Sequence, residues 1–171
     1  MTTFKRSATA TLIAAAAVAT TGLVTASPAS AASYHCTSSS KSIDMPQYSG
    51  PWPDNFDFTV KNCAKRSGSY VSAYSKISWD APTTAGQVNT FDAAYFRLYL
   101  KKSVSGSDPV LRHKDSGLRS KLEAGDGSYT TSTVKYKVGR SKGVGDGTLR
   151  LNWNNDGADY KTYKFKVSPR V

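Results

Sequence analysis

Apolar and polar residues alternate along most of the chain beyond residue 55. A period of two places apolar side chains on one face and polar side chains on the other, which is the pattern of a half-buried β-strand. The alternating segments are 56–61, 71–79, 94–101, 134–138, 149–153 and 163–167. Turn-forming residues stand between several of them, at Gly125-Asp126-Gly127, Gly145-Asp146-Gly147 and Asn154-Asn155-Asp156-Gly157. Only residues 117–124 are ambiguous between helix and loop, so the region predicts an all-β fold.

Six or seven antiparallel strands with one apolar face each must bury those faces together. Two sheets packed face to face, or a small barrel, would do this, and we predict a single antiparallel β-sandwich domain over residues 56–171. The last three strands, 128–138, 148–154 and 159–167, are expected to form a meander through two tight turns.

Residues 32–55 lack this alternation and are rich in serine and proline. Pro51 and Pro53 fix the backbone on both sides of Trp52 and remove hydrogen-bond donors, so this piece cannot occupy a central strand. We predict an extended N-terminal arm. The two cysteines of the chain, Cys36 and Cys63, are expected to form one disulfide that ties the arm to the domain.

The first 31 residues have the three parts of a signal peptide. Lys5 and Arg6 give a positive start, residues 11–24 are apolar, and Ala29-Ser30-Ala31 is a small-residue cleavage site. A membrane anchor is the alternative, but threonines and a glycine interrupt the apolar stretch, which is shorter than the roughly 20 residues that a span needs. We predict cleavage after Ala31, a secreted, extracellular mature chain and no membrane insertion.

The mature chain is strongly basic. Because Lys5 and Arg6 serve export, it keeps 21 of the 23 basic residues and all 12 acidic ones, a net charge of 21 − 12 = +9. In the predicted meander, five cations share the outer face: Lys135, Lys137, Arg150, Lys164 and Lys166. This basic face is either a docking surface for a polyanion or an acidic partner, or a solvated face whose lysines protect edge strands.

A second candidate surface lies on the strand 94–101. Tyr95, Arg97, Tyr99 and Lys101 point away from the predicted core, and Tyr70 and Tyr74 could extend the stripe. Alternating aromatic and cationic side chains suit sugar stacking, nucleic-acid stacking or a protein hot spot. The alternative is that tyrosine is simply a good strand former, half buried under a loop or the arm.

The arm is the third candidate. Tyr48 and Trp52 supply large apolar side chains in an otherwise polar segment. Trp52 either folds back onto the domain or inserts into a partner as part of an extended ligand. Our hypothesis is that residues 37–54 bind a partner and do not complete the core.

Catalysis has little support in the sequence. A small basic ribonuclease would need an acid and a base, for which Glu123 and His113 with Arg112 or Arg119 are the available set. One histidine and one glutamate make a weak match, and the GxSxG and HExxH motifs are absent. The Gly-Asp-Gly turns are too poor in acids for calcium. We predict no enzyme, no catalytic residue, no metal and no cofactor.

The stretch Val60-Lys61-Asn62-Cys63-Ala64-Lys65-Arg66-Ser67-Gly68-Ser69-Tyr70-Val71, followed by Ile77-Ser78-Trp79, resembles small secreted β-sandwich proteins of actinobacteria. Some proteins of this kind are adaptor subunits of umbrella toxin particles. The resemblance implies a non-enzymatic subunit that joins two larger subunits, with an extended N-terminal segment contributing to docking.

We therefore interpret the chain as a secreted, non-catalytic binding or adaptor module in an extracellular, antibacterial protein complex, with another secreted protein as its partner. A stand-alone binder of an anionic cell-surface polymer or carbohydrate is the alternative, and a small secreted nuclease or hydrolase is the second alternative. Nucleic acid is not expected as a partner.

Overall fold

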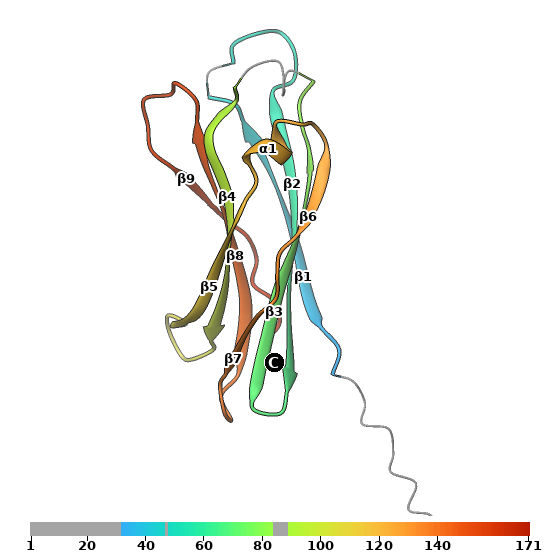
Figure 1. Ribbon diagram of the computed structural model, residues 1–171, viewed down its shortest axis with the longest axis vertical. Coiled ribbons are helices and arrows are strands. Elements are labelled where there is room, and N and C mark those ends of the chain that lie inside the picture. The colour runs from blue at the N-terminus through green and yellow to red at the C-terminus, as the bar shows by residue number, and fades with distance from the viewer. Residues whose placement is uncertain (1–31, 47, 84–88) are drawn as a thin grey trace, which may run out of the picture. The chain divides into compact units, whose positions relative to one another are not determined.

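The computed structural model describes residues 32–46, 48–83 and 89–171, and residues 32–171 form one compact unit. The predicted signal peptide, residues 1–31, lies outside the described residues. Nearly all regular structure is strand, arranged as two antiparallel sheets packed face to face (Figure 1). The predicted all-β fold with two antiparallel sheets and one disulfide is confirmed.

The first sheet has five strands. β1 (His35–Asp44), β2 (Asn55–Ser67) and β3 (Tyr70–Asp80) lie side by side in this order, and β3 also pairs with β6 (Gly127–Thr130) and β7 (Val134–Lys137). The second sheet has four strands in the order β5 (Val110–Gly117), β4 (Phe91–Lys102), β8 (Gly143–Trp153) and β9 (Lys161–Lys164). A single helical turn, α1 (Arg119–Leu122), leads from the second sheet to the first.

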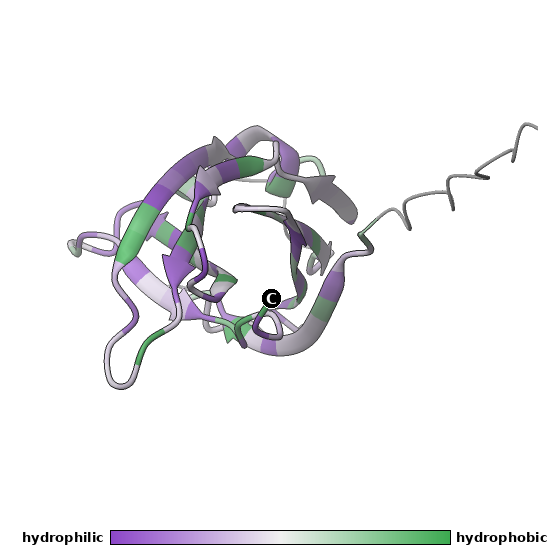
Figure 2. Ribbon diagram, turned by 90° about the horizontal axis from the view of Figure 1, so that it is seen from below, coloured by the Kyte–Doolittle hydropathy of each residue, from purple (hydrophilic) through white to green (hydrophobic). Residues whose placement is uncertain are grey.

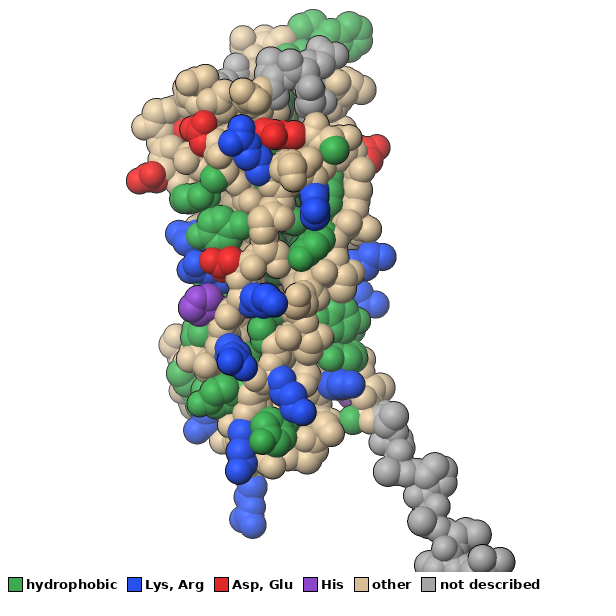
Figure 3. All heavy atoms as spheres, in the orientation of Figure 1, with side chains coloured by type: hydrophobic (Ala, Val, Ile, Leu, Met, Phe, Trp, Pro, Cys, Tyr) green, Lys and Arg blue, Asp and Glu red, His purple; other side chains and the backbone are tan. Residues whose placement is uncertain are grey.

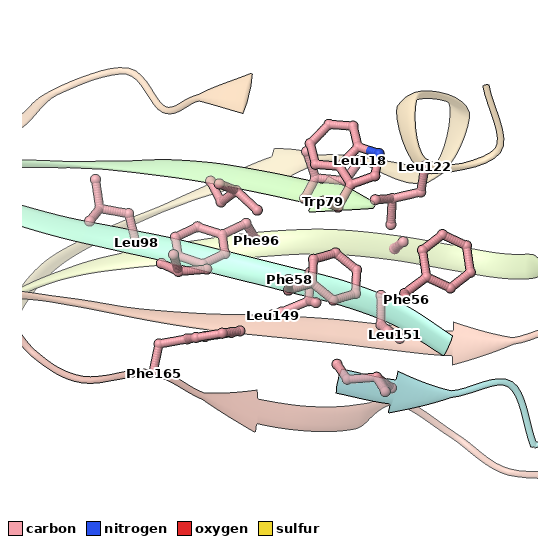
Figure 4. Close-up of a cluster of buried hydrophobic side chains, with 14 of the residues drawn as sticks. Phe56, Phe58, Trp79, Phe96, Leu98, Leu118, Leu122, Leu149, Leu151 and Phe165 are labelled. Carbon is pink, nitrogen blue, oxygen red and sulfur yellow. The ribbon is translucent and has the colours of Figure 1, made fainter. Parts of the chain in front are cut away.

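The alternation of the sequence builds the core. Figure 2 shows the strands arranged around a common centre, with hydrophilic and hydrophobic residues alternating along them. Side chains from both sheets meet there and are fully buried, among them Phe56, Phe58, Phe96, Leu98, Leu149 and Leu151 (Figure 4). Burying one such side chain contributes about 1.5–3 kcal/mol, so this core is the main force holding the two sheets together.

Three glycines at alternate positions of β8, Gly143, Gly145 and Gly147, face the interior. A Cβ on Gly145 would lie 2.9 Å from the carbonyl oxygen of Cys63, and one on Gly147 would lie 2.2 Å from Cζ of Phe96. The prediction of a turn at Gly145-Asp146-Gly147 is therefore wrong. These glycines belong to a strand whose neighbours leave no room for a side chain.

The predicted meander of the last three strands is wrong for its first strand, although β8 and β9 do pair as expected. β6 and β7 pair with β3 in the first sheet, whereas β8 and β9 belong to the second. Between β6 and β7 the ladder is interrupted at Thr131. The backbone N–H of Thr131 donates to the Ser75 carbonyl at 2.9 Å, and the Thr131 hydroxyl oxygen accepts from the Ser75 N–H, also at 2.9 Å. Alternation shows which face a strand buries, but it does not show which strand becomes its neighbour.

The predicted arm divides into two parts. Residues 35–44 form β1, which pairs with β2 along its whole length, and Cys36 lies directly opposite Cys63, to which it is disulfide-bonded. Ile43 and Met45 are buried in the core. This first part therefore completes the domain, which overturns the hypothesis that the whole segment 37–54 is reserved for a partner. The alternation is hidden because an edge strand buries few side chains.

The segment after β9 closes one side of the sandwich. It continues beside β8, where Ser168 N–H and Val171 N–H donate to the carbonyls of Gly145 and Gly143 at 2.8 and 3.0 Å. The Asn62 side chain of β2 donates to the carbonyl of Lys166 at 2.8 Å. The two sheets are thus joined through hydrogen bonds as well as through the core.

Candidate functional site

The predicted stripe lies on the outer face of β4 and consists of Tyr95, Arg97, Tyr99 and Lys101. These four side chains are half-buried, whereas the residues between them are buried and point toward the core. β5 and β8 flank β4 on its two sides. His113 of β5 lies opposite Tyr99, with the ring centres 6.2 Å apart. The four predicted residues therefore do share one surface.

Two of the cations on this surface already have carboxylate partners. The Arg97 guanidinium donates two hydrogen bonds to Asp115, from Nε to Oδ1 at 2.6 Å and from Nη2 to Oδ2 at 2.7 Å. These bonds hold the pKa of the Asp115 carboxyl below its usual value and raise the pKa of Arg97. Lys101 Nζ lies 2.5 Å from Oδ2 of Asp146. Little unpaired charge is left on the stripe for a ligand.

A third cation joins the stripe from β8. Arg150 donates to the Tyr95 hydroxyl at 2.7 Å and to the Thr162 hydroxyl at 3.2 Å. Its guanidinium carbon lies 5.6 Å from the ring centres of both Tyr95 and Tyr160. The aromatic rings are therefore occupied by the protein's own cations, which is a preorganised surface but not a set of open stacking platforms.

The predicted basic face is not assembled. Arg150 and Lys164 lie on β8 and β9 of the second sheet, and Lys166 lies beyond β9, where its backbone N–H donates to Ser39 of β1. Lys135 and Lys137 lie on β7 of the first sheet, so the five cations are divided between the two sheets. The error follows from the misplaced first strand of the meander, because β7, which carries Lys135 and Lys137, pairs with β3 and not with β8.

Lys135 and Lys137 instead share the outer face of the first sheet with other lysines. The pairing register brings Lys65, Ser72 and Lys135 into one row, and Lys61 and Lys76 into another. We call Lys61, Lys65, Lys76, Lys135 and Lys137 the lysine face. Tyr34, Tyr70 and Tyr74 lie among these lysines, so the prediction that Tyr70 and Tyr74 extend the β4 stripe is wrong.

Lys61, Lys65 and Lys76 belong to a surface that the sequence alone does not predict. Their positions on the polar side of two predicted strands were readable from the alternation. The sequence does not show that β3, which carries Lys76, lies between β2 and β7, because only the sheet order supplies this.

The loop between β1 and β2 lies at one end of the sandwich, which we call the loop end. Trp52 is 67% exposed there, the highest exposed fraction among the large hydrophobic side chains of the described residues. The backbone N–H of Trp52 donates to the Tyr48 hydroxyl at 3.3 Å, and Gly50 lies against the Tyr48 ring. The second part of the predicted arm is therefore a folded loop with its tryptophan turned outward.

A cavity of about 370 Å³ opens beside this loop. Its lining combines apolar and amide side chains from the loop, from the start of β4 and from the β8–β9 turn: Met45, Pro46, Tyr48, Asn89, Thr90, Trp153, Asn154 and Asn155. The indole N–H of Trp153 is buried without a hydrogen-bond partner. The loop end thus presents both a projecting tryptophan and a hollow.

The residues considered for acid–base catalysis are not brought together by any contact. His113 lies on the outer face of β5, whereas Glu123 follows α1, where its carboxylate accepts from the Phe91 N–H and the Arg119 side chain at 3.3 Å each. Glu123 therefore has a structural role at the start of β4. Among the residues that the structure describes, no group of three or more His, Cys, Asp or Glu side chains is arranged to hold a metal ion.

Acidic side chains gather toward one end of the strands in the view of Figure 3, whereas basic side chains occur along the whole length. Most acids lie at or near the loop end: Asp44, Asp54, Asp57, Asp80, Asp92, Glu123, Asp126, Asp156 and Asp159. The remaining ones are engaged, Asp115 with Arg97, Asp146 with Lys101, and Asp108 with the backbone N–H of Val104 at 2.9 Å. The half of the domain away from the loop end is consequently strongly cationic.

None of the described helical structure has the length and apolar character required to cross a bilayer. Comparison with known proteins finds no matching family model, no matching curated protein and no matching solved structure.

Proposed function

We propose that this protein is a secreted, non-catalytic binding module that docks onto a partner protein through its loop end. The observation that carries the proposal is the exposure of Trp52, at 67%, on a loop that is otherwise held in place. Tryptophan is enriched at the energetic centres of protein interfaces, because it buries a large apolar area on binding.

The loop is suited to docking because little order has to be gained on binding. Met45 anchors its beginning in the core, and β2 starts directly after its end. Pro51 and Pro53 restrict the backbone on both sides of Trp52. A contact loop that is already ordered loses less conformational entropy when a partner immobilises it.

Secretion is part of the proposal. It is supported by the signal-peptide pattern of residues 1–31 and by the disulfide between Cys36 and Cys63, since disulfides persist in oxidising compartments. The non-catalytic role is supported by Glu123, which is occupied in structural hydrogen bonds. The finer role of an adaptor in an antibacterial toxin particle rests on the resemblance of residues 60–71 and 77–79.

The test uses the tagged protein isolated from the culture medium of its source organism, with co-eluting proteins identified by mass spectrometry. Affinity for the purified partner is then measured for the wild type, Trp52→Ala and a control, Tyr136→Ala, which removes another exposed aromatic side chain (43%) far from the loop. We expect Trp52→Ala to weaken binding by about 2 kcal/mol or more, with an unchanged melting temperature, and the control to have no effect. Equal affinities for all three proteins would refute the proposal.

A further inference from the structure

We propose that the lysine face binds a linear polymer of open-chain polyols joined by phosphodiesters. This site lies on the outer face of the first sheet, apart from the loop end, and is independent of the protein docking proposed above.

The unusual feature of the lysine face is a pair of lysines at directly opposite positions of two strands, neither of which forms an ion pair among the described residues. Lys61 of β2 and Lys76 of β3 are directly opposite each other in the register. Like charges in this position destabilise a sheet. The ion pairs of the described residues involve Arg97, Lys101, Arg119 and Lys161, and none of the five lysines. An anionic ligand would remove this repulsion.

A hollow of about 420 Å³ marks where an anion would lie. Lys61 and Lys76 line it together with aromatic and hydroxyl-bearing side chains: Tyr34, Tyr74, Thr130, Thr131 and Thr133. Ammonium and hydroxyl groups donate hydrogen bonds to phosphate oxygens. The lining contains no carboxylate that would repel the ligand.

The arrangement of the lysines favours a polymer over a single ion. Lys61 and Lys65 are four residues apart on β2, which is about 13 Å along a strand. Lys65 and Lys135 lie in one row on either side of Ser72, about 10 Å apart across the sheet. No single phosphate reaches all of these positions, whereas a chain with repeated phosphates contacts several of them together.

The choice of residues favours an open-chain polymer over one with bases or sugar rings. Lys65 Nζ lies 4.6 Å from the centre of the Tyr34 ring, and Lys135 Nζ lies 4.6 Å from that of Tyr70. A base would have to displace these ammonium groups before it could stack. The cations at the outward positions of β2, β3 and β7 are all lysines, which act as point charges and lack the planar fork of arginine for bidentate recognition.

The test measures the affinity of the purified secreted protein for poly(glycerol phosphate) over a range of salt concentrations. The test variant is Lys61→Gln/Lys76→Gln/Lys135→Gln. The matched control, Lys114→Gln/Lys142→Gln/Lys164→Gln, removes the same charge from exposed lysines outside the lysine face. We expect the test variant to lose about tenfold or more in affinity and to lower the salt slope by about 2, and the control to lose less than about threefold.

Several outcomes would overturn the proposal. Equal losses in the two triple variants would mean that net charge alone is responsible. Tighter binding of a single-stranded oligonucleotide, of heparin or of anionic lipid vesicles than of poly(glycerol phosphate) would assign the face to a different ligand. No measurable binding of the polymer would also exclude the site.

A second measurement keeps the test independent of folding. Lys76→Gln alone removes the opposed pair, and we expect it to weaken polymer binding while leaving the melting temperature unchanged or higher, because a repulsion is lost. A lower melting temperature would contradict the repulsion between Lys61 and Lys76 from which the site is inferred, and would overturn the proposal. Trp52→Ala should bind the polymer like the wild type, which separates this site from the loop end.

Discussion

Gly147 of β8 lies against the ring of Phe96 on the neighbouring strand β4, so that a Cβ at this position would be 2.2 Å from Cζ. We expect Gly147→Ala to destabilise the domain by about 1–3 kcal/mol, because the added methyl group forces the core to move. Gly117→Ala is the control, since it also lies in a strand but has no atom within 4 Å of the added Cβ. Denaturant unfolding of both variants measures the difference. Equal stabilities would show that the packing around β8 is looser than the structure indicates.

The disulfide between Cys36 and Cys63 should contribute strongly to stability, because it joins the edge strand β1 to β2 across 27 residues. Restriction of the unfolded chain by a loop of this size is worth about 3.5 kcal/mol. We expect the melting temperature of Cys36→Ser/Cys63→Ser to fall clearly below that of the wild type. Mass spectrometry of the unreduced protein after alkylation should show no added mass, and a mass increase would contradict the disulfide.

Asn62 is a buried polar residue whose two bonds connect three parts of the fold. Its Oδ1 accepts from Ser75 Oγ at 2.5 Å, and its Nδ2 donates to the Lys166 carbonyl. Asn62→Ala leaves the buried Ser75 hydroxyl and the partly buried Lys166 carbonyl without these partners, so we expect a loss of about 1–3 kcal/mol in the free energy of unfolding. Ser40→Ala removes an exposed hydrogen bond to Thr59 and should be almost neutral. Similar losses in both variants would mean that burial does not decide the effect.

The contributions of two aspartates to stability should change in opposite directions as the pH falls. Hydrogen bonding to Arg97 lowers the pKa of Asp115, so its ionised form stabilises the fold, and this contribution is lost as the pH falls through the lowered pKa. A hydrogen bond shared with Asp126, the charge of Asp126, burial and the charge of Asp57 raise the pKa of Asp80. Ionised Asp80 therefore destabilises the fold, and the stability that it contributes increases as the pH falls.

We expect Asp115→Asn to lower and Asp80→Asn to raise the melting temperature at neutral pH. The Asp80 difference should shrink as the pH falls through its raised pKa toward about 4, whereas the Asp115 difference should shrink only as the pH falls below about 4. Melting curves between neutral pH and acid measure both effects. A shift of the same sign in the two variants at neutral pH would contradict this account.

Much of the fold could be predicted from local pattern. Phe56, Phe58 and Val60 alternate with polar residues, and the structure buries them. The sequence predicts an arm where β1 lies, because an edge strand buries few side chains. It predicts a turn at the glycines of β8, because a glycine pair around an aspartate is typical of a turn. The atoms that require glycine there belong to Cys63 and Phe96, which are distant in sequence.

The candidate sites also differ in how far the sequence alone predicts them. Tyr95, Arg97, Tyr99 and Lys101 lie on one strand, so their common face followed from alternation alone. The lysine face and the division of the predicted basic face depend on which strands are neighbours. No residue pattern within β7 indicates that it pairs with β3 and not with β8.

The sequence by itself determined that the chain is all-β, that Cys36 and Cys63 are the cysteines available to pair, and which side chains of most strands enter the core, because these follow from local periodicity and composition. Only the tertiary structure decided that β6 and β7 join β3, that Lys61 meets Lys76, and that Gly147 must lack a side chain. The physical reason is that strand pairing and sheet packing are contacts between residues far apart in the chain, and the alternation of one strand is compatible with many partners.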